Sequence, residues 1–286
     1  MRGIDVSSYQ KKPDWSEVKE SGIEFAILRI MDSKGEDASF EHNYAGCRDT
    51  GIARGAYRYS YALSNEQAKA EAKGVLTFLA GRKLEMGVWL DLEWNRQREL
   101  GRTRVRDIAN IWMRVIRSAG YECNIYCNKD WYENICGGMD AKYWIARYPA
   151  EDMGTLRPEL RPRMGEIGWQ YSQRGRVAGI SGNVDMDIWY SEVTLEEGNP
   201  YKEPEKALKY IPVLTRIIRQ DVKWLQWELR ESGYDMIVDG KFGPVTDMAL
   251  RAFQAEHPGT YSGEVPDGVC GAKTRAALKA VSAPRL

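Results

Sequence analysis

The chain has 286 residues, of which 43% are hydrophobic and 29% charged. This composition is typical of an ordinary folded protein that is long enough for more than one domain. Its 41 Lys and Arg residues balance its 41 Asp and Glu residues, so it lacks the basic surplus that favours a nucleic-acid partner. Ten Trp and sixteen Tyr against five Phe favour rings with a polar handle, which sugar-binding clefts use.

Several other classes are disfavoured by simple counts. No apolar run approaches the roughly 20 residues of a membrane span, and no basic segment followed by an apolar stretch opens the chain, so we expect no signal peptide. The five cysteines form no CxxC pair, which predicts reduced, buried thiols. His42 and His257 are the only histidines and no HExxH motif exists, so we expect neither a metal nor a cofactor.

Hydrophobic patterns predict alternating strands and helices in the first part of the chain. We expect strands within 3–10, 24–30, 53–61, 87–94, 124–127, 143–148, 167–171 and 184–189, and helices near 14–18, 40–50, 64–79 and 103–119. After residue 119 loops or single turns replace the helices. The pattern predicts a modified TIM-like α/β fold, a parallel barrel whose second half has lost helices, with its chemistry at the C-terminal strand ends.

The segment from Gly87 to Trp94 places two acids in an apolar strand. Side chains alternate faces, so Trp89, Asp91 and Glu93 share one face, with about 6–7 Å between the acidic Cβ atoms from a rise of ~3.3 Å per residue. Neighbouring carboxyl groups in apolar surroundings separate in pKa. One protonated acid beside one charged partner is the arrangement that glycoside cleavage requires.

Further acids and rings fall at or near predicted strand ends. Asp5 and Asp185 would complete an acidic floor beneath Glu93 and raise its pKa by like-charge repulsion. Alternation places Asp187 on the same face as Asp185. The candidate sugar-contacting rings are Tyr9, Tyr57, Tyr59, Tyr126, Trp169 and Tyr171.

The last third carries an internal repeat. Residues 239–250 and 267–278 both have the form Asp-Gly-x-x-Gly-x-x-Thr-x-x-Ala-Leu, which predicts a tight turn followed by a capped helix. An amphipathic helix over 222–229 precedes them. We therefore predict a small three-helix domain over 213–286, joined by a charged, Pro-containing linker over 196–212 to a first domain over 1–195.

Both parts resemble known families. The tail is similar to the peptidoglycan-binding domain of wall hydrolases through its two Asp-Gly repeats and its Phe-Gln pair. The first domain resembles the family 25 glycoside hydrolases, lysozymes with a modified β/α barrel, through the segments 3–10, 57–61, 90–94, 144–146, 169–171 and 184–187. The chain has Asp187 where that family commonly has Asn.

The resemblance implies hydrolysis of the β-1,4 bond between N-acetylmuramic acid and N-acetylglucosamine in bacterial peptidoglycan. Glu93 would be the general acid and base, and Asp91 would either attack the sugar or orient its acetamido group, the second being the route that the family favours. Arg29 and Lys34 would meet the lactyl or peptide carboxylates of muramic acid. The absent signal peptide suggests a phage endolysin, or an autolysin exported another way.

Two alternatives stay open at this stage. One is a chitinase-like hydrolase of another N-acetylated glycan, and the other is a wall-binding protein whose barrel is no longer catalytic. The retained acids Asp5, Asp91, Glu93 and Asp185 argue against the second alternative. Oligomeric state has no signature in the sequence.

Overall fold

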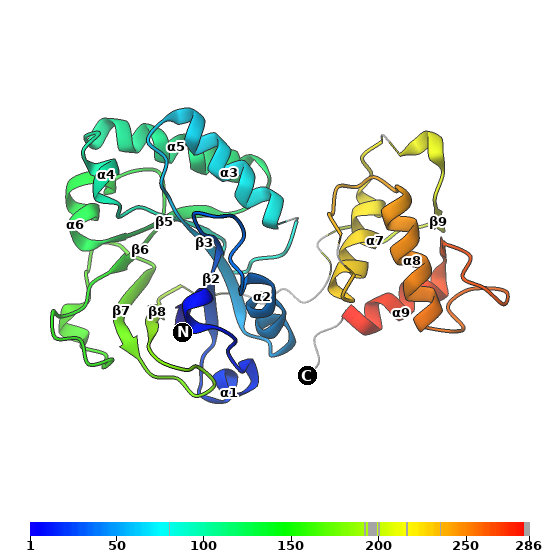
Figure 1. The fold of residues 1–286 in the computed structure, drawn as a ribbon, viewed down its shortest axis with the longest axis horizontal. Coiled ribbons are helices and arrows are strands. Elements are labelled where there is room, and N and C mark those ends of the chain that lie inside the picture. Colours follow the sequence, from blue (N-terminus) through cyan, green and yellow to red (C-terminus); the bar gives the residue numbers. More distant parts are fainter. Residues whose placement is uncertain are drawn as a thin grey trace. The chain divides into compact units, whose positions relative to one another are not determined.

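The computed structural model describes the chain except for residues 80, 192, 194–198, 200, 216, 235 and 283–286. It separates into two compact units, one formed by Met1–Leu79 with Lys83–Leu195 and the other including Glu196–Arg285 (Figure 1). None of the helices in the described part combines the length and the apolar character that crossing a membrane requires.

The first unit is a closed barrel of eight described strands arranged in chain order. Each successive pair of strands from β1 to β7 is parallel, whereas β8 is antiparallel to both β7 and β1. The strands are β1 (Arg2–Val6), β2 (Phe25–Met31), β3 (Ala53–Tyr59), β4 (Val88–Asp91), β5 (Cys123–Asn128), β6 (Tyr143–Ala146), β7 (Gly168–Gly175) and β8 (Val184–Trp189).

The antiparallel direction of β8 corrects the prediction of an all-parallel barrel. Antiparallel neighbours need no crossover connection, so residues 176–183 can join β7 to β8 without a helix. As a result, the beginning of β8 lies at the barrel edge where the parallel strands end. Asp185 is therefore the direct partner of Asp5 across the β1–β8 ladder.

The helices follow the predicted decline along the barrel. Figure 1 shows α3 and α5 on the outside of the barrel, where they contact each other. The early helices are α1 (Trp15–Glu20), α2 (Phe40–Asp49), α3 (Asn65–Leu79), α4 (Asn95–Arg98) and α5 (Arg102–Ser118). After β5, the described part of the barrel unit contains α6 (Lys129–Trp131), a π-helical turn (Tyr132–Cys136) and a 3-10 turn (Pro158–Leu160). The predicted loss of helices in the second half is confirmed.

Strand alternation divides the barrel into two apolar layers. Side chains on the outward faces pack against the helices in one large buried cluster. Inward-facing aromatics fill the barrel, and Trp89 contacts both Trp144 and Trp189 edge to face, with ring centroids 6.0 and 5.1 Å apart. The barrel interior is therefore packed toward the N-terminal ends of the parallel strands, and open space is left at their C-terminal ends.

The described part of the second unit contains three α-helices with their own buried core. They are α7 (Gln220–Glu231), α8 (Pro244–Glu256) and α9 (Ala272–Ser282), accompanied by the short antiparallel pair β9 (Leu208–Lys209) and β10 (Val269–Cys270). The predicted three-helix domain is confirmed. The predicted linker over 196–212 falls partly outside the described residues, and its described Leu208 is buried in this second core.

The repeat extends further upstream than its motif suggested. In the first copy Gln226 Nε2 donates to Asp239 Oδ1 at 2.9 Å and Lys241 O at 3.1 Å, while the Gly240 N–H donates to Gln226 Oε1 at 2.7 Å. In the second copy Gln254 makes the equivalent bonds to Asp267, Val269 and Gly268. Each repeat is thus a helix whose buried glutamine holds the following Asp-Gly turn.

We expect Gln226→Leu to destabilise the second unit by about 2–4 kcal/mol, because the Gly240 N–H and two acceptors lose a buried partner. Hydrogen exchange measured by mass spectrometry across residues 220–282 of the full chain would detect the change. Gln220→Leu is the matched control, since Gln220 is exposed on the same helix. Equal protection in Gln226→Leu and wild type would contradict the role of this glutamine.

Candidate active site

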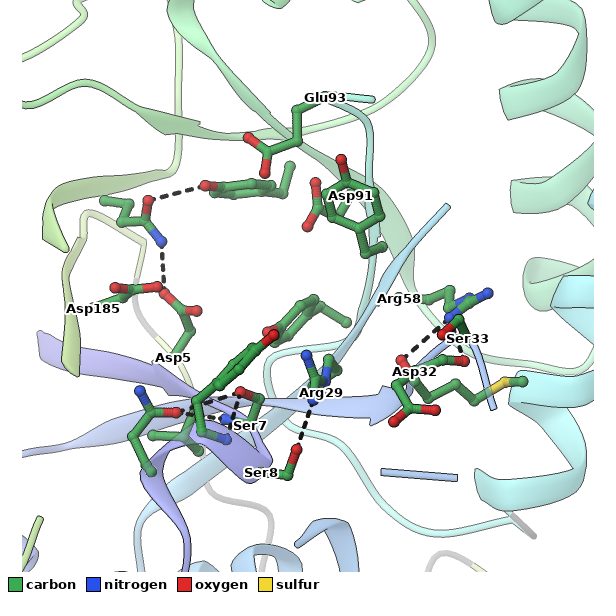
Figure 2. Close-up of a pocket in the computed structure, with 18 of the residues that line it drawn as sticks. Asp5, Ser7, Ser8, Arg29, Asp32, Ser33, Arg58, Asp91, Glu93 and Asp185 are labelled. Atoms are coloured by element: carbon green, nitrogen blue, oxygen red, sulfur yellow. Dashed lines mark hydrogen bonds between the residues drawn. The ribbon is translucent and has the colours of Figure 1, made fainter. Parts of the chain in front are cut away.

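A cavity of about 570 Å³ opens at the C-terminal ends of the parallel strands (Figure 2). Its wall combines acids, tyrosines and a few cations. The lining residues are Asp5, Val6, Ser7, Ser8, Tyr9, Gln10, Arg29, Met31, Asp32, Ser33, Lys34, Tyr57, Arg58, Tyr59, Tyr61, Asp91, Glu93, Tyr126, Trp144, Gln170 and Asp185.

Four of the predicted acids meet in this cavity. Asp5 is the second-to-last residue of β1, Asp91 is the last residue of β4, and Asp185 is the second residue of β8. Glu93 lies two residues beyond β4 and reaches the cavity together with Asp91 (Figure 2). The predicted strand over 87–94 is shorter than expected, yet both carboxyl groups lie on the cavity wall.

Asp187 is a fifth acid beneath this group. It is fully buried and does not line the cavity. Its Oδ1 accepts a hydrogen bond of 2.9 Å from Trp144 Nε1, and it lies close enough to Asp5 and Asp185 for their charges to act on each other. Asp187 therefore belongs to the acidic floor of the site and not to its surface.

Burial and mutual repulsion favour protonation throughout this cluster. Burial, followed by the charges of Asp185 and Asp187, raises the pKa of Asp5 well above its ordinary value. Burial and the charge of Asp185 also raise the pKa of Glu93, and burial raises the pKa of Asp185 to about 6. Carboxyl groups this close cannot all ionise, so the cluster retains protons near neutral pH.

A hydrogen-bond chain crosses the cavity from β5 to β1. Tyr126 donates its hydroxyl hydrogen to Gln170 Oε1 at 2.9 Å, and Gln170 Nε2 donates to Asp5 Oδ2 at 2.7 Å. Both bonds appear as dashed lines in Figure 2. The chain fixes the orientation of the Asp5 carboxyl relative to the opposite wall.

Six of the predicted contact residues line the cavity: Tyr9, Arg29, Lys34, Tyr57, Tyr59 and Tyr126. Tyr9 stands at the rim with 82% of its surface exposed. The Arg29 guanidinium lies 5.2 Å from its ring centroid and is already bound to Asp37 Oδ2 at 2.6 Å. Arg29 is therefore a partly neutralised cation, whereas Lys34 is exposed on the β2–α2 loop.

Trp169 and Tyr171, which we predicted to contact the sugar, do not line the cavity. Both lie in the apolar layer between barrel and helices, and Trp169 Nε1 donates to the Arg147 carbonyl at 2.8 Å. Because side chains alternate along β7, these rings point outward and Gln170 between them points inward.

The sequence reasoning missed Gln170, Trp144 and Arg58. The parity of β7 would have pointed to Gln170, a polar residue between two aromatic ones. Arg58 had no such signal, because it alternates with the inward-facing Tyr57 and Tyr59 and reaches the cavity only at the strand end. Within the described residues, no three His, Cys, Asp or Glu side chains are arranged to hold a metal ion.

Residues 4–180 match the protein family described as Glycosyl hydrolases family 25. The chain belongs to this family. Residues 219–278 match the Putative peptidoglycan binding domain. Family 25 membership confirms the predicted glycoside hydrolase of the lysozyme type and the barrel resemblance.

Relatives of this family 25 chain include two named lysozymes. The Autolytic lysozyme of Clostridium acetobutylicum is 27% identical over 263 residues, which cover 89% of this chain and 73% of that protein. Lysozyme M1 of Streptomyces globisporus is 30% identical over 202 residues, which cover 65% and 67% of the two chains. The first of these alignments extends beyond the barrel into the second unit.

Solved structures share the family 25 barrel. The modular autolysin LytC from Streptococcus pneumoniae, in complex with a synthetic peptidoglycan ligand, superposes with a TM-score of 0.57 at 25% identity, covering 66% of this chain and 46% of that one. The bacterial lysozyme from Streptomyces coelicolor superposes with a TM-score of 0.53 at 26% identity, covering 67% and 92%. This chain thus spans less than half of LytC.

We expect Asp187→Asn to stabilise the fold at neutral pH. Burial, and then the charge of Asp185, raises the pKa of Asp187 in the folded protein, whereas an unfolded Asp titrates near ~3.9. Unfolding above pH ~4 therefore releases a proton, so stability is lost as pH rises. The amide side chain keeps the hydrogen bond from Trp144 but releases no proton on unfolding. The free energy of unfolding of the variant should therefore exceed that of wild type by at most about 1.4 kcal/mol more for each pH unit above ~4.

Urea unfolding between pH 4 and pH 8 would measure the effect. The curves of Asp187→Asn and wild type should converge near pH 4 and separate as pH rises. Asp107→Asn, an exposed position on α5, should follow wild type at every pH. Parallel curves for Asp187→Asn and wild type would show that this carboxyl does not hold a proton in the folded state.

Proposed function

We propose that this family 25 lysozyme cleaves the β-1,4 bond between N-acetylmuramic acid and N-acetylglucosamine through Glu93 and Asp91. The observation that supports the assignment is the placement of Asp91 and Glu93 together on the wall of one cavity, above a buried acidic floor. A proton donor needs a raised pKa to hold its proton near neutral pH, and burial supplies this for Glu93.

Glu93 acts first as the general acid. Its proton passes to the glycosidic oxygen as the bond to the anomeric carbon breaks, and the leaving sugar departs as an alcohol. The carbonyl oxygen of the substrate's own 2-acetamido group attacks that carbon from the opposite face and forms a cyclic oxazoline-type intermediate. Glu93, now a carboxylate, then removes a proton from water, which opens the ring with overall retention of configuration.

Asp91 assists the acetamido group in this scheme. Its carboxyl oxygen accepts the amide N–H and stabilises the positive charge that develops on the ring. Its side chain is buried, and within the described part of the chain no group donates a hydrogen bond to its Oδ1. An acceptor of this kind fits a substrate N–H. Direct attack by Asp91 on the sugar is the alternative route.

The cavity walls favour a glycan as the occupant. Tyr57, Tyr59 and Tyr126 offer rings with hydroxyl groups, which can contact sugar faces and bond to their hydroxyls. Lys34 lies exposed beside this wall, where a peptide or lactyl carboxylate of muramic acid would pair with it. Chitin lacks those carboxylates, so the cation favours peptidoglycan over the chitinase-like alternative.

Glu93→Gln should lower the rate of peptidoglycan cleavage by roughly 10²–10⁴-fold, the contribution of a positioned general acid. Mass spectrometry of the wild-type digest should show new reducing ends on N-acetylmuramic acid, with no comparable release from chitin. Glu99→Gln, which changes an exposed acid just beyond α4, should keep wild-type activity. If Glu93→Gln cleaved peptidoglycan at nearly the wild-type rate, the assignment of Glu93 as general acid would be wrong.

We further propose that the second unit holds the enzyme on the wall through its match to the peptidoglycan-binding domain. Binding by a linked module raises the local enzyme concentration on an insoluble substrate. Because each unit has its own hydrophobic core, residues 1–195 alone should fold. This truncated chain should sediment less with intact walls while cleaving small soluble fragments at a similar rate, and equal loss of both would contradict a separate binding module.

A further inference from the structure

A row of aromatic rings leaves the cavity on the side of β3 and of the segment that follows β4. Tyr59 and Tyr61 both line the cavity, and their ring centroids lie 4.9 Å apart. The Tyr61 ring meets the Trp94 ring edge to face, with centroids 5.3 Å apart. Tyr61 is 40% exposed, and Trp94 is partly exposed without lining the cavity. The three rings, which we call the aromatic row, therefore continue the cavity wall beyond the cavity.

The aromatic row is held in place by polar contacts of the backbone beside it. The Tyr61 N–H donates to Glu71 Oε1 at 2.8 Å. Gln97 of α4 is fully buried and donates to the carbonyl oxygen of Ala62 at 2.9 Å. This second bond ties the helix after Trp94 to the segment after Tyr61. Rings that are fixed in this way lose little conformational freedom when a ligand packs on them.

The polar atoms of the aromatic row are available to a ligand. Within the described residues, neither the hydroxyl groups of Tyr59 and Tyr61 nor the indole N–H of Trp94 forms a hydrogen bond. The barrel interior differs in this respect, since Trp89 Nε1 donates to the carbonyl oxygen of Met86 at 2.7 Å. Partly exposed rings with unused polar atoms fit the apolar faces and the hydroxyl groups of a sugar.

The cavity alone is too small to enclose a glycan strand. Its volume of about 570 Å³ lies in the range of sites that enclose a small molecule, so a polymer must continue past its edge. Tyr9, the most exposed ring of the cavity wall at 82%, has no aromatic neighbour within the described residues. The aromatic row begins at Tyr59 inside the cavity and therefore offers the strand a continuous surface.

We propose that Tyr61 and Trp94 form an outer sugar subsite, which binds a residue of the peptidoglycan strand beyond the two sugars joined by the cleaved bond; the identity of the strand rests on the proposed function. Such a subsite contributes binding energy away from the reacting atoms. Its loss should therefore slow the cleavage of long substrates and leave the shortest one unaffected.

Kinetics on two substrates test the subsite in the full chain. One is the disaccharide of N-acetylmuramic acid β-1,4-linked to N-acetylglucosamine, and the other is an octasaccharide of the same repeat. Tyr61→Leu and Trp94→Leu should lower kcat/KM for the octasaccharide roughly 5–20-fold, the loss expected from about 40–70 Å² of apolar contact. Both variants should cleave the disaccharide at the wild-type rate. Tyr61→Phe keeps the ring and should retain most of the wild-type value on both substrates.

Tyr190 offers the matched control. It is 38% exposed and its ring lies 3.6 Å from the Arg161 guanidinium, much as the Tyr61 ring lies 5.3 Å from that of Arg58. Tyr190 follows the end of the antiparallel β8, so it lies at the barrel end opposite the cavity and does not line it. Tyr190→Leu should leave kcat/KM for both substrates unchanged.

A binding measurement separates the subsite from the proposed catalysis. In the ¹⁵N-labelled full chain carrying Glu93→Gln, the indole N–H signal of Trp94 is the one that disappears when Trp94→Leu is added. The octasaccharide should shift this signal by more than the disaccharide does. The signal reports on one ring of the barrel unit, so glycan binding by the second unit does not produce the same result.

Two results would overturn the proposal. One is a Trp94 signal that responds equally to both oligosaccharides or to neither of them. The other is a fall in kcat/KM that is equal for both substrates, or absent for both, in folded Tyr61→Leu and Trp94→Leu. If the disaccharide is cleaved too slowly to measure, the NMR titration decides. A wild-type chain that fails to cleave peptidoglycan would refute the proposed function and leave this titration readable, because it needs no turnover.

Discussion

Five carboxyl groups confined at one end of a barrel form the constraint on which the site depends. Asp5, Asp91, Glu93, Asp185 and Asp187 are buried to different degrees, and each has its pKa raised first by burial. Such a cluster is costly to charge, so the structure must decide which members keep protons. It does so by depth and by partner. Asp187 lies fully buried and bonds to Trp144, and in Asp91 the charge of Arg58 opposes the effects of burial and of Glu93 on its pKa.

The packed interior of the barrel creates this constraint. Trp89, Trp144 and Trp189 fill the space below the acids, so water reaches the carboxyl groups only from the open end. The antiparallel β8 contributes a further acid to the cluster, because its reversed direction places Asp185 opposite Asp5. A parallel eighth strand would put its early residues at the closed end of the barrel, and the floor would lose an acid.

The barrel and its acids could be predicted from the sequence because both depend on the alternation of side chains along strands. Small errors in the predicted strand bounds do not change that alternation. Asp91 and Glu93 reach the cavity although β4 ends earlier than predicted, since a short extended segment beyond a strand keeps roughly the same alternation. Trp169 and Tyr171 do not line the cavity, for the opposite reason. Their aromatic character suggested sugar contact, but the parity of β7 gives the inward position to Gln170.

The direction of β8 and the hydrogen-bond partners of Arg58 could not be predicted from local patterns. A strand has the same alternation in either direction, so only the short β7–β8 connection distinguishes the two. Arg58 bonds to partners far away in the sequence, at Met31, Asp32 and Glu71. Its neighbours in the chain do not reveal those contacts.

Both units contain a buried polar residue that accepts or donates several hydrogen bonds within an apolar layer. In the barrel, Glu71 accepts bonds from Arg58, Ser60 and Tyr61 and so fixes the end of β3 beside the acid segment. In the second unit, Gln226 and Gln254 each hold an Asp-Gly turn from a buried helix position. A buried polar group is stable only when its partners are in place. Each such residue therefore fixes one loop geometry, and these are the loops that the proposed catalysis and the repeat fold depend on.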